Sequence, residues 1–179
     1  MFNISEIQTT PPANFQTSLQ KDTYNALSRL NISFERLDTD EAITMEDCIL
    51  INQKLNMKMV KTLFLCNRQK TLFFLFVTCG DKAFNSGAFS KAMNCSRVSF
   101  ASEDLFFEML GTKIGAATVF SAIKDIDGDI HIVIDKDVAT EEYYGCSDGT
   151  TTCYLKIKTS DILQKFLPYA KHKAHIIQI

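Results

Sequence analysis

The sequence has no long hydrophobic run and no start of the kind that directs export. Its longest apolar stretch, residues 72–77, is far shorter than the roughly 20 residues that a membrane-spanning helix needs. The first residues, Met1 to Glu6, contain neither the basic region nor the apolar region of a secretory signal. We therefore expect a cytoplasmic protein with no membrane partner.

Metal-binding and catalytic motifs are scarce as well. Cysteine occurs six times but never as a Cys-x-x-Cys pair, and the three histidines stand at no ligand spacing. We expect reduced thiols, no metal and no cofactor. The motifs G-x-x-x-x-G-K-[ST], G-x-G-x-x-G and G-x-S-x-G are missing, whereas a cysteine–histidine nucleophile pair stays open. Residues 125–129 resemble a calcium loop, but the glycine is misplaced and Lys136 stands where a glutamate is needed.

Neither sign of charge is in large excess, since the formal net charge is −2. A protein that coats long nucleic acids usually has a strongly basic face, so DNA is not an expected partner. Gripping an RNA end needs only a few local cations, and one short stretch supplies them. These cations are Lys54, Lys58, Lys61, Arg68 and Lys70. For each of them except Lys61, a solvated surface position explains the charge at least as well.

The chain alternates helical and strand patterns without a Gly/Ser linker or a repeat. Residues 1–17, which contain Pro11-Pro12, predict a loose lead-in to one domain over residues 18–179. The patterns predict helices near 18–30, 44–55 (opened by Thr44), 86–93, 103–110 and 160–170, and strands near 34–37, 62–66, 71–78, 97–100, 119–123, 130–135, 150–157 and 175–179. Asp127-Gly128 predicts a hairpin turn. This mixture predicts an α/β (α+β) fold in which helices pack around a mixed sheet.

Lys61 stands out on physical grounds. It directly precedes the apolar strand 62–66, beside a second apolar strand. A lysine at the mouth of a core strand can hold a phosphate or polarise a carbonyl. A lysine whose stem packs on the strand end while its ammonium stays in water is the commoner explanation. The residue pattern alone leaves both interpretations open.

Several segments together form a specific series. Residues 61–70 contain a lysine followed by Thr-Leu-Phe-Leu, and Gly80-Asp81-Lys82 follows. The sequence Arg-Val-Ser-Phe-Ala-Ser occupies residues 97–102, and a glycine-rich loop occupies 115–120. Residues 134–137 and 159–163 complete the series. In order and spacing, from about residue 20 to the end, these segments resemble the ProX-type branch of the YbaK superfamily, the free-standing relatives of the editing domain of bacterial prolyl-tRNA synthetase.

The resemblance implies a partly open barrel of mixed β-sheet and an aminoacyl-tRNA deacylase. Such an enzyme hydrolyses the ester between a mismatched small amino acid, often alanine, and a tRNA specific for proline. Its partners would be the acceptor end of that tRNA and prolyl-tRNA synthetase. The resemblance implies catalytic roles for Lys61, Gly115 and Thr118, substrate binding by Ala116, Ala117, Phe120, Ser147, Thr151 and Thr152, and tRNA binding by Lys58, Arg68 and Lys82.

One stretch departs from the family pattern. Relatives carry His-Pro and then Asn-Thr where this chain has Ser147-Asp148 and then Thr151-Thr152. Asp148 would bring a carboxylate near the anionic RNA end and weaken tRNA binding. Two other functions therefore stay open. One is a catalytically weakened module that binds aminoacyl-tRNA or a synthetase, and the other is a small-molecule-binding domain that uses the same fold.

Overall fold

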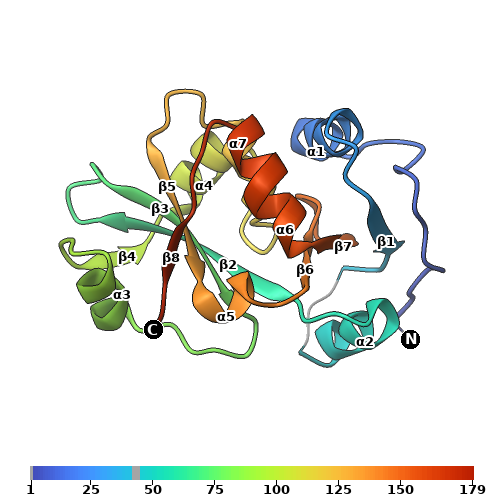
Figure 1. Ribbon diagram of the computed structural model, residues 1–179, viewed down its shortest axis with the longest axis horizontal. Helices are drawn as coiled ribbons and strands as arrows, with labels where there is room; N and C mark the ends of the chain where they lie inside the picture. Colours follow the sequence, from blue (N-terminus) through green and yellow to red (C-terminus); the bar gives the residue numbers. More distant parts are fainter. Residues whose placement is uncertain (1, 42–44) are drawn as a thin grey trace.

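The computed structural model describes residues 2–41 and 45–179, and it contains two β-sheets with helices packed around them (Figure 1). The five-stranded sheet has the order β4 (Val98–Phe100), β2 (Val60–Asn67), β3 (Phe73–Cys79), β5 (Ile130–Asp135) and β8 (His175–Ile177). The three-stranded sheet has the order β1 (Phe34–Asp38), β7 (Cys153–Lys158) and β6 (Tyr143–Ser147). The three-stranded sheet is antiparallel, whereas the larger sheet is mixed, since β5 runs parallel to both of its neighbours. The expected mixed architecture is confirmed.

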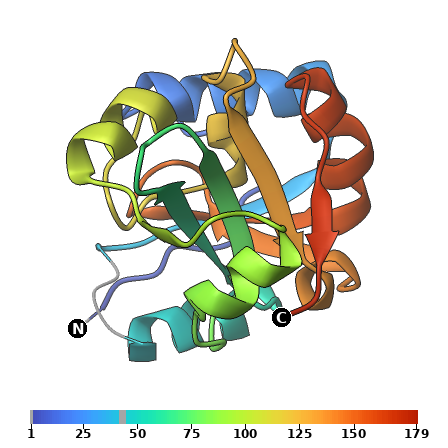
Figure 2. The same cartoon turned by 90° about the vertical axis from the view of Figure 1, so that its left-hand side faces the viewer.

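The helices lie on both faces of the larger sheet. They are α1 (Ser18–Arg29), α2 (Met45–Leu55), α3 (Ser86–Ala92), α4 (Glu103–Leu110), the 3-10 helix η1 (Val119–Ile123), α5 (Lys136–Ala139) and a C-terminal helix. The C-terminal helix consists of three consecutive parts, α6 (Thr159–Asp161), the π-helical η2 (Ile162–Phe166) and α7 (Leu167–Tyr169). Figures 1 and 2 show α3 on one side of this sheet, with α1 and the C-terminal helix on the other. Within the described residues, no helix is long and apolar enough to cross a membrane.

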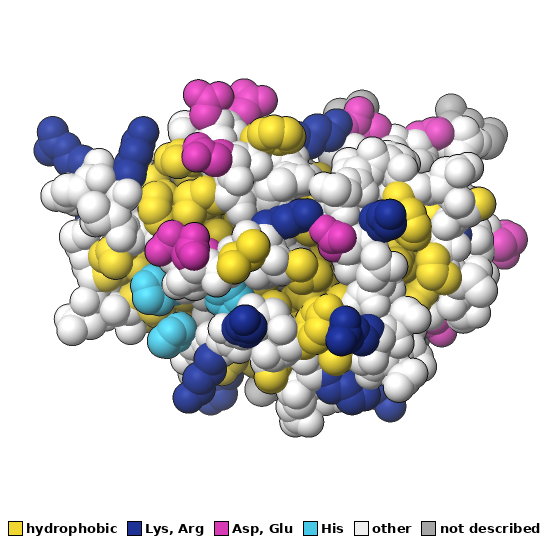
Figure 3. Space-filling view, turned by 90° about the horizontal axis from the view of Figure 1, so that it is seen from above, with side chains coloured by type: hydrophobic (Ala, Val, Ile, Leu, Met, Phe, Trp, Pro, Cys, Tyr) yellow, Lys and Arg dark blue, Asp and Glu magenta, His cyan; other side chains and the backbone are white. Residues whose placement is uncertain are grey.

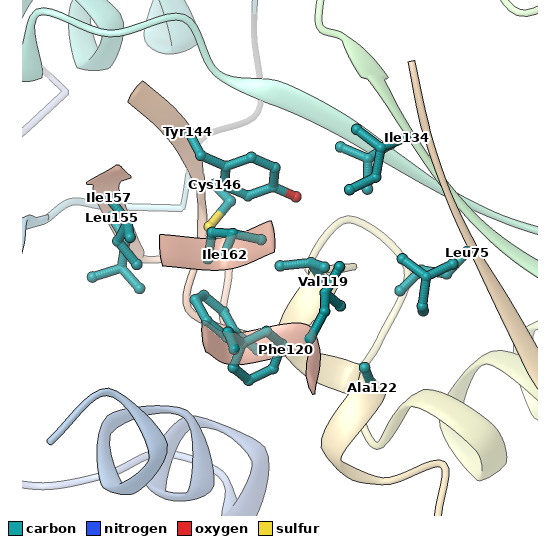
Figure 4. Close-up of a cluster of buried hydrophobic side chains, with 14 of the residues drawn as sticks. Leu75, Val119, Phe120, Ala122, Ile134, Tyr144, Cys146, Leu155, Ile157 and Ile162 are labelled. Atoms are coloured by element: carbon teal, nitrogen blue, oxygen red, sulfur yellow. The ribbon is translucent and has the colours of Figure 1, made fainter. Parts of the chain in front are cut away.

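Strand β3 supplies side chains to two separate hydrophobic cores. Leu75 and Val77 belong to the large core between the two sheets, while Phe74 and Phe76 belong to a smaller core under α3. Both faces of β3 are therefore covered, as its nearly continuous apolar sequence predicts. Figure 4 shows the large core, in which side chains of both sheets meet those of η1 and the C-terminal helix. The labelled residues are Leu75, Val119, Phe120, Ala122, Ile134, Tyr144, Cys146, Leu155, Ile157 and Ile162.

A third core joins α2 to the small sheet. Ile51 and Leu55 of α2 pack with Leu37 of β1 and Tyr154 of β7. Thr44, which the sequence predicts as the start of this helix, lies outside the described residues. The lead-in over residues 2–17 has no helix or strand of its own, but it forms isolated bridges to the strand β1 and to the residue after it, through Gln8↔Arg36 and Ile4↔Thr39.

The prediction of a strand at residues 119–123, joined by a hairpin to the next strand, is wrong. This segment is the 3-10 helix η1, and β5 pairs in parallel with β3 and β8. The segment is buried on nearly all sides, and a short apolar run of this kind does not distinguish a strand from a helical turn. The Asp127-Gly128 turn is instead closed by Asp125, whose carboxylate accepts from the amides of Asp129 and Ile130 at 3.0 and 2.8 Å.

Strand β6 was missed in the sequence, because glycine and serine are weak strand formers. Its central residue, Gly145, forms a parallel bridge with Met59 and so joins the small sheet to the start of β2. A Cβ atom at Gly145 would lie 2.6 Å from Met57 Sδ and 2.9 Å from the Lys58 carbonyl oxygen. Only a residue without a side chain allows this close approach.

Replacing Gly145 with alanine is therefore expected to destabilise the protein by about 1–3 kcal/mol, because the new methyl group overlaps a backbone carbonyl that cannot move alone. Urea unfolding followed by circular dichroism would measure the loss. Gly87→Ala, in the exposed first turn of α3, is the matched control and is expected to leave stability unchanged or to raise it by up to about 1 kcal/mol, because alanine is the better helix former. Equal midpoints for wild type and Gly145→Ala would show that the two sheets can separate there without cost.

Candidate functional site

A cavity of about 1080 Å³ lies where the start of β2, the turn after β3 and the loop before η1 come together. Its volume is at the upper end for small-molecule sites, which leaves room for more than one chemical group. The lining comes from segments far apart in the sequence, among them residues 58–64, 79–81 and 114–115. Five of the residues predicted for the site line this one cavity: Lys58, Lys61, Gly115, Ala117 and Ser147.

Lys61 is the second residue of β2 and is half-buried. Its ammonium donates a hydrogen bond to the backbone carbonyl of Lys82, which fixes the side chain against the loop after β3. An ammonium carries three N–H donors, so two remain for a ligand in the cavity. A carbonyl is uncharged, so this partner does not offset the positive charge of Lys61 as a carboxylate would.

Lys82 is held by two carboxylates. Its ammonium bonds Asp135 Oδ2 at 2.8 Å and Asp137 Oδ2 at 3.0 Å. Asp135 is fully buried and also accepts from the Thr78 hydroxyl. Burial opposes ionisation of Asp135, but the hydrogen bonds from Lys82 and Thr78 lower its pKa, so it stays charged. The tRNA-binding role of Lys82 stays a prediction; in the free protein its side chain anchors the loop, and its carbonyl positions Lys61.

The other two predicted tRNA-binding cations differ in position. Lys58 lines the cavity with its side chain largely exposed, and it pairs with Glu141 at 2.5 Å. Arg68 follows the far end of β2, so at about 3.3 Å per residue it lies roughly 20 Å from Lys61. It is not part of the lining. On the face seen in Figure 3, basic and acidic side chains are mixed in the upper part, and basic ones predominate along the lower edge.

The predicted substrate loop presents only some of its residues to the cavity. Gly115 has φ 91° and lines the cavity together with Ala117. Ala116, Thr118 and Phe120 are completely buried and do not line it. Thr118 begins η1, and its hydroxyl oxygen accepts from the Phe120 amide at 3.5 Å. In the free protein these three side chains support the loop from behind, and their direct roles stay predictions.

The altered segment after β6 braces this loop. Ser147 lines the cavity, and its hydroxyl donates to the Ala116 carbonyl at 3.3 Å. The Thr112 hydroxyl donates to the Gly149 carbonyl at 2.9 Å, which ties the two loops together again. Thr152 does not line the cavity. Its hydroxyl oxygen accepts a hydrogen bond from Gln16 Nε2 at 2.9 Å. The segment is therefore mainly a support for the Gly115 loop.

Asp148 points away from the cavity, contrary to our expectation that it faces the RNA end. It is completely buried, and its Oδ2 accepts from Gln20 Nε2 at 2.7 Å and from the Tyr24 hydroxyl at 3.0 Å, both on α1. Its Oδ1 accepts from the amide and the hydroxyl of Thr150 at 3.1 and 2.8 Å. Burial, and then the charge of Asp148, raises the pKa of Tyr24, so this hydroxyl stays protonated and can donate.

Cysteine chemistry is not favoured in this cavity. Cys48 and Cys79 both line it, and all six cysteines are free thiols. Burial raises the pKa of both thiols, and a neighbouring aspartate, Asp47 for Cys48 and Asp135 for Cys79, raises each further. A thiol that keeps its proton is a weak nucleophile.

Sequence reasoning missed several lining residues. They include Asn52, Thr62, Tyr143 and Tyr154, together with Asp137 and Glu141 from the α5 region. None of them carries a recognisable motif, and only the packing of α2, α5 and β6 around the start of β2 brings them together. Phe100 and Ala101 also line the cavity, and both belong to the sequence step at residues 97–102 that the family resemblance used.

Comparisons with known proteins agree with the resemblance. A family model described as an aminoacyl-tRNA editing domain matches residues 39–165. Prolyl-tRNA synthetase associated domain-containing protein 1 of Danio rerio is 24% identical over 161 residues, covering 89% of this chain and 86% of that protein. Prolyl-tRNA editing protein ProX of Acetoanaerobium sticklandii is 26% identical over 112 residues, covering 63% of this chain and 68% of that protein.

The fold has solved counterparts. A protein proposed to be a trans-editing enzyme for prolyl tRNA synthetase superposes with a TM-score of 0.63 at 13% identity, covering 92% of this chain and 98% of the other. At this identity the likeness concerns the fold alone, and it confirms the expected arrangement of sheets and helices.

Proposed function

The chain belongs to the aminoacyl-tRNA editing domain family, and from this premise we propose that it hydrolyses the ester of a wrongly aminoacylated tRNA that carries alanine or another small amino acid. The observation that carries the proposal is the meeting of Lys61 and the Gly115 loop in one cavity. The names of two relatives, a ProX protein and a synthetase-associated protein, favour a tRNA for proline and contact with prolyl-tRNA synthetase.

The proposed chemistry is modest and suits the groups in the cavity. An aminoacyl ester is already reactive, so the site has to orient a water molecule, polarise the carbonyl and hold the terminal adenosine. The two remaining N–H donors of Lys61 supply positive charge beside the ester or its neighbouring phosphate. Backbone groups of the Gly115 loop face the carbonyl, where a side chain would obstruct approach. No strong nucleophile is needed, in keeping with the protonated thiols of Cys48 and Cys79.

Specificity for a small amino acid would come from shape. Ile114, Ala117 and Phe106 contribute apolar walls to the cavity. A wall can reject a larger side chain by steric overlap, whereas one missing methylene of contact changes selectivity by only about 1–3 kcal/mol. Selection for a small amino acid therefore requires little space beside Ile114, Ala117 and Phe106.

A panel of tRNAs charged with alanine, serine, cysteine or proline tests the proposal by release of the amino acid under single-turnover conditions. We expect fast release from alanyl-tRNA specific for proline, slower release from other small residues and little release from prolyl-tRNA. Tight binding without release would support the binding module instead. Neither binding nor release would support a small-molecule-binding domain.

A further inference from the structure

A cluster of three side chains at the edge of the cavity has the character of an anion-binding site already filled by a carboxylate. Glu41 Oε1 accepts hydrogen bonds from Lys113 Nζ at 3.0 Å and from Thr151 Oγ1 at 2.9 Å. These residues come from three segments far apart in the sequence, so the fold itself creates the cluster. The side chains of Lys113 and Glu41 are 62% and 53% exposed, which leaves the cluster open to a large ligand.

The cluster borders the proposed catalytic loop. Lys113 directly precedes Ile114 and Gly115, which line the cavity. Thr151 Cγ2 lies 3.8 Å from the position that a Cβ atom on Gly115 would take. A ligand whose reacting end reaches Gly115 therefore passes Lys113 and Thr151 as it leaves the cavity.

An ammonium and a hydroxyl that converge on one oxygen form a pattern suited to phosphate as well as to carboxylate, since both anions accept charge-assisted hydrogen bonds. When the nucleotide at the acceptor end enters the cavity, the phosphate that joins it to the rest of the strand stays at the mouth of the cavity. Glu103 and Asp104 line a second groove together with Lys113. That groove repels an anion, so the position beside Thr151 is the one open to a phosphate.

Resting on the proposed function, we propose that Lys113 and Thr151 bind a backbone phosphate of the tRNA acceptor strand, and that Glu41 occupies this phosphate site in the free protein. Binding exchanges one anion for another: the Glu41 carboxylate moves into water, and the phosphate takes its two hydrogen bonds. Glu41 thereby weakens the binding of other anions at this site. A tRNA is held by further contacts as well, so its phosphate can displace Glu41.

The test measures binding of uncharged tRNA to the whole protein, by fluorescence anisotropy at several salt concentrations. Lys113→Ala is expected to weaken binding at low salt by about 3- to 10-fold and to reduce the slope of log affinity against log salt by about 0.7–0.9, the value for one phosphate contact. Glu41→Gln is expected to strengthen binding at low salt, because the competing charge is gone. Lys21→Ala, an exposed lysine on α1, is the matched control and should leave both quantities unchanged.

The proposal is overturned if Lys113→Ala keeps the wild-type salt slope, if Glu41→Gln binds tRNA more weakly than wild type, or if wild type binds no tRNA. Lys113→Gln repeats the test with a side chain of similar length, and circular dichroism checks that each variant is folded. Ester hydrolysis is measured separately. The expected binding changes without hydrolysis support the phosphate site and contradict the proposed function, whereas hydrolysis with unchanged binding does the reverse.

Discussion

Asp148→Ala is expected to destabilise the protein by about 3–4 kcal/mol. The substitution removes the acceptor for Gln20 Nε2 and the Tyr24 hydroxyl, both of which are buried. It also removes the acceptor for the Thr150 hydroxyl. Each buried donor left without a partner costs about 1–3 kcal/mol, which exceeds the gain from no longer burying a carboxylate. Urea unfolding at neutral pH measures the difference.

Two further variants sharpen this prediction. Asp148→Asn keeps the shape and one acceptor oxygen, so it should cost only about 1–2 kcal/mol. Asp127→Ala is the matched control, because this aspartate is exposed and has no side-chain partner among the described residues, and its change should stay within about 0.5 kcal/mol. A loss below about 1 kcal/mol in Asp148→Ala would mean that water or a shift of α1 satisfies the donors.

The second large effect is expected at Lys61. Lys61→Ala should slow hydrolysis of mischarged tRNA by about 30- to 1000-fold, because loss of one preorganised donor at the reacting group raises the barrier by about 2–4 kcal/mol. Stability should change by less than about 1 kcal/mol, since the side chain is only half-buried. Single-turnover release of the amino acid, together with urea unfolding of the same sample, separates the two effects.

Lys61→Arg and Lys91→Ala complete the test. Arginine keeps the charge, but its wider planar group cannot make the same bond to the Lys82 carbonyl, so only partial activity should return. Lys91 is exposed on α3 and should be replaceable without effect on the rate. A wild-type rate in Lys61→Ala would show that the family role does not transfer to this residue.

The parts of the fold that the sequence predicts correctly are those with strong local patterns. The apolar residues of β3 indicate a strand covered on both faces, and the helix predicted near 18–30 is α1, Ser18–Arg29. The parts that it predicts wrongly depend on distant neighbours. Gly145 is a strand residue because Met57 and Lys58 pack against it, and nothing near it in the sequence indicates this contact.

The same limit applies to the site. Lys61 could be singled out because a lysine at the start of an apolar strand is locally unusual. The orientation of Asp148 could not, because its partners Gln20 and Tyr24 are more than a hundred residues away. Lys82 looked like a free cation until Asp135 and Asp137 were placed beside it. Whether a charged side chain has an ion-pair partner in the structure is therefore a better guide to its function than its presence in the sequence.

The small sheet has a consequence for the order in which the chain folds. Its strand β1 pairs with β7, so that Phe34 meets Ile157. During synthesis from the N-terminus, β1 can bridge only to the lead-in, through Gln8, until β7 has emerged, and closing so long a loop is slow. Strands β2 and β3 are joined by a short turn and can pair as soon as both are made. For most of its synthesis the nascent chain thus carries β1 without its β7 partner, so the small sheet is completed after β2 and β3 have begun to pair.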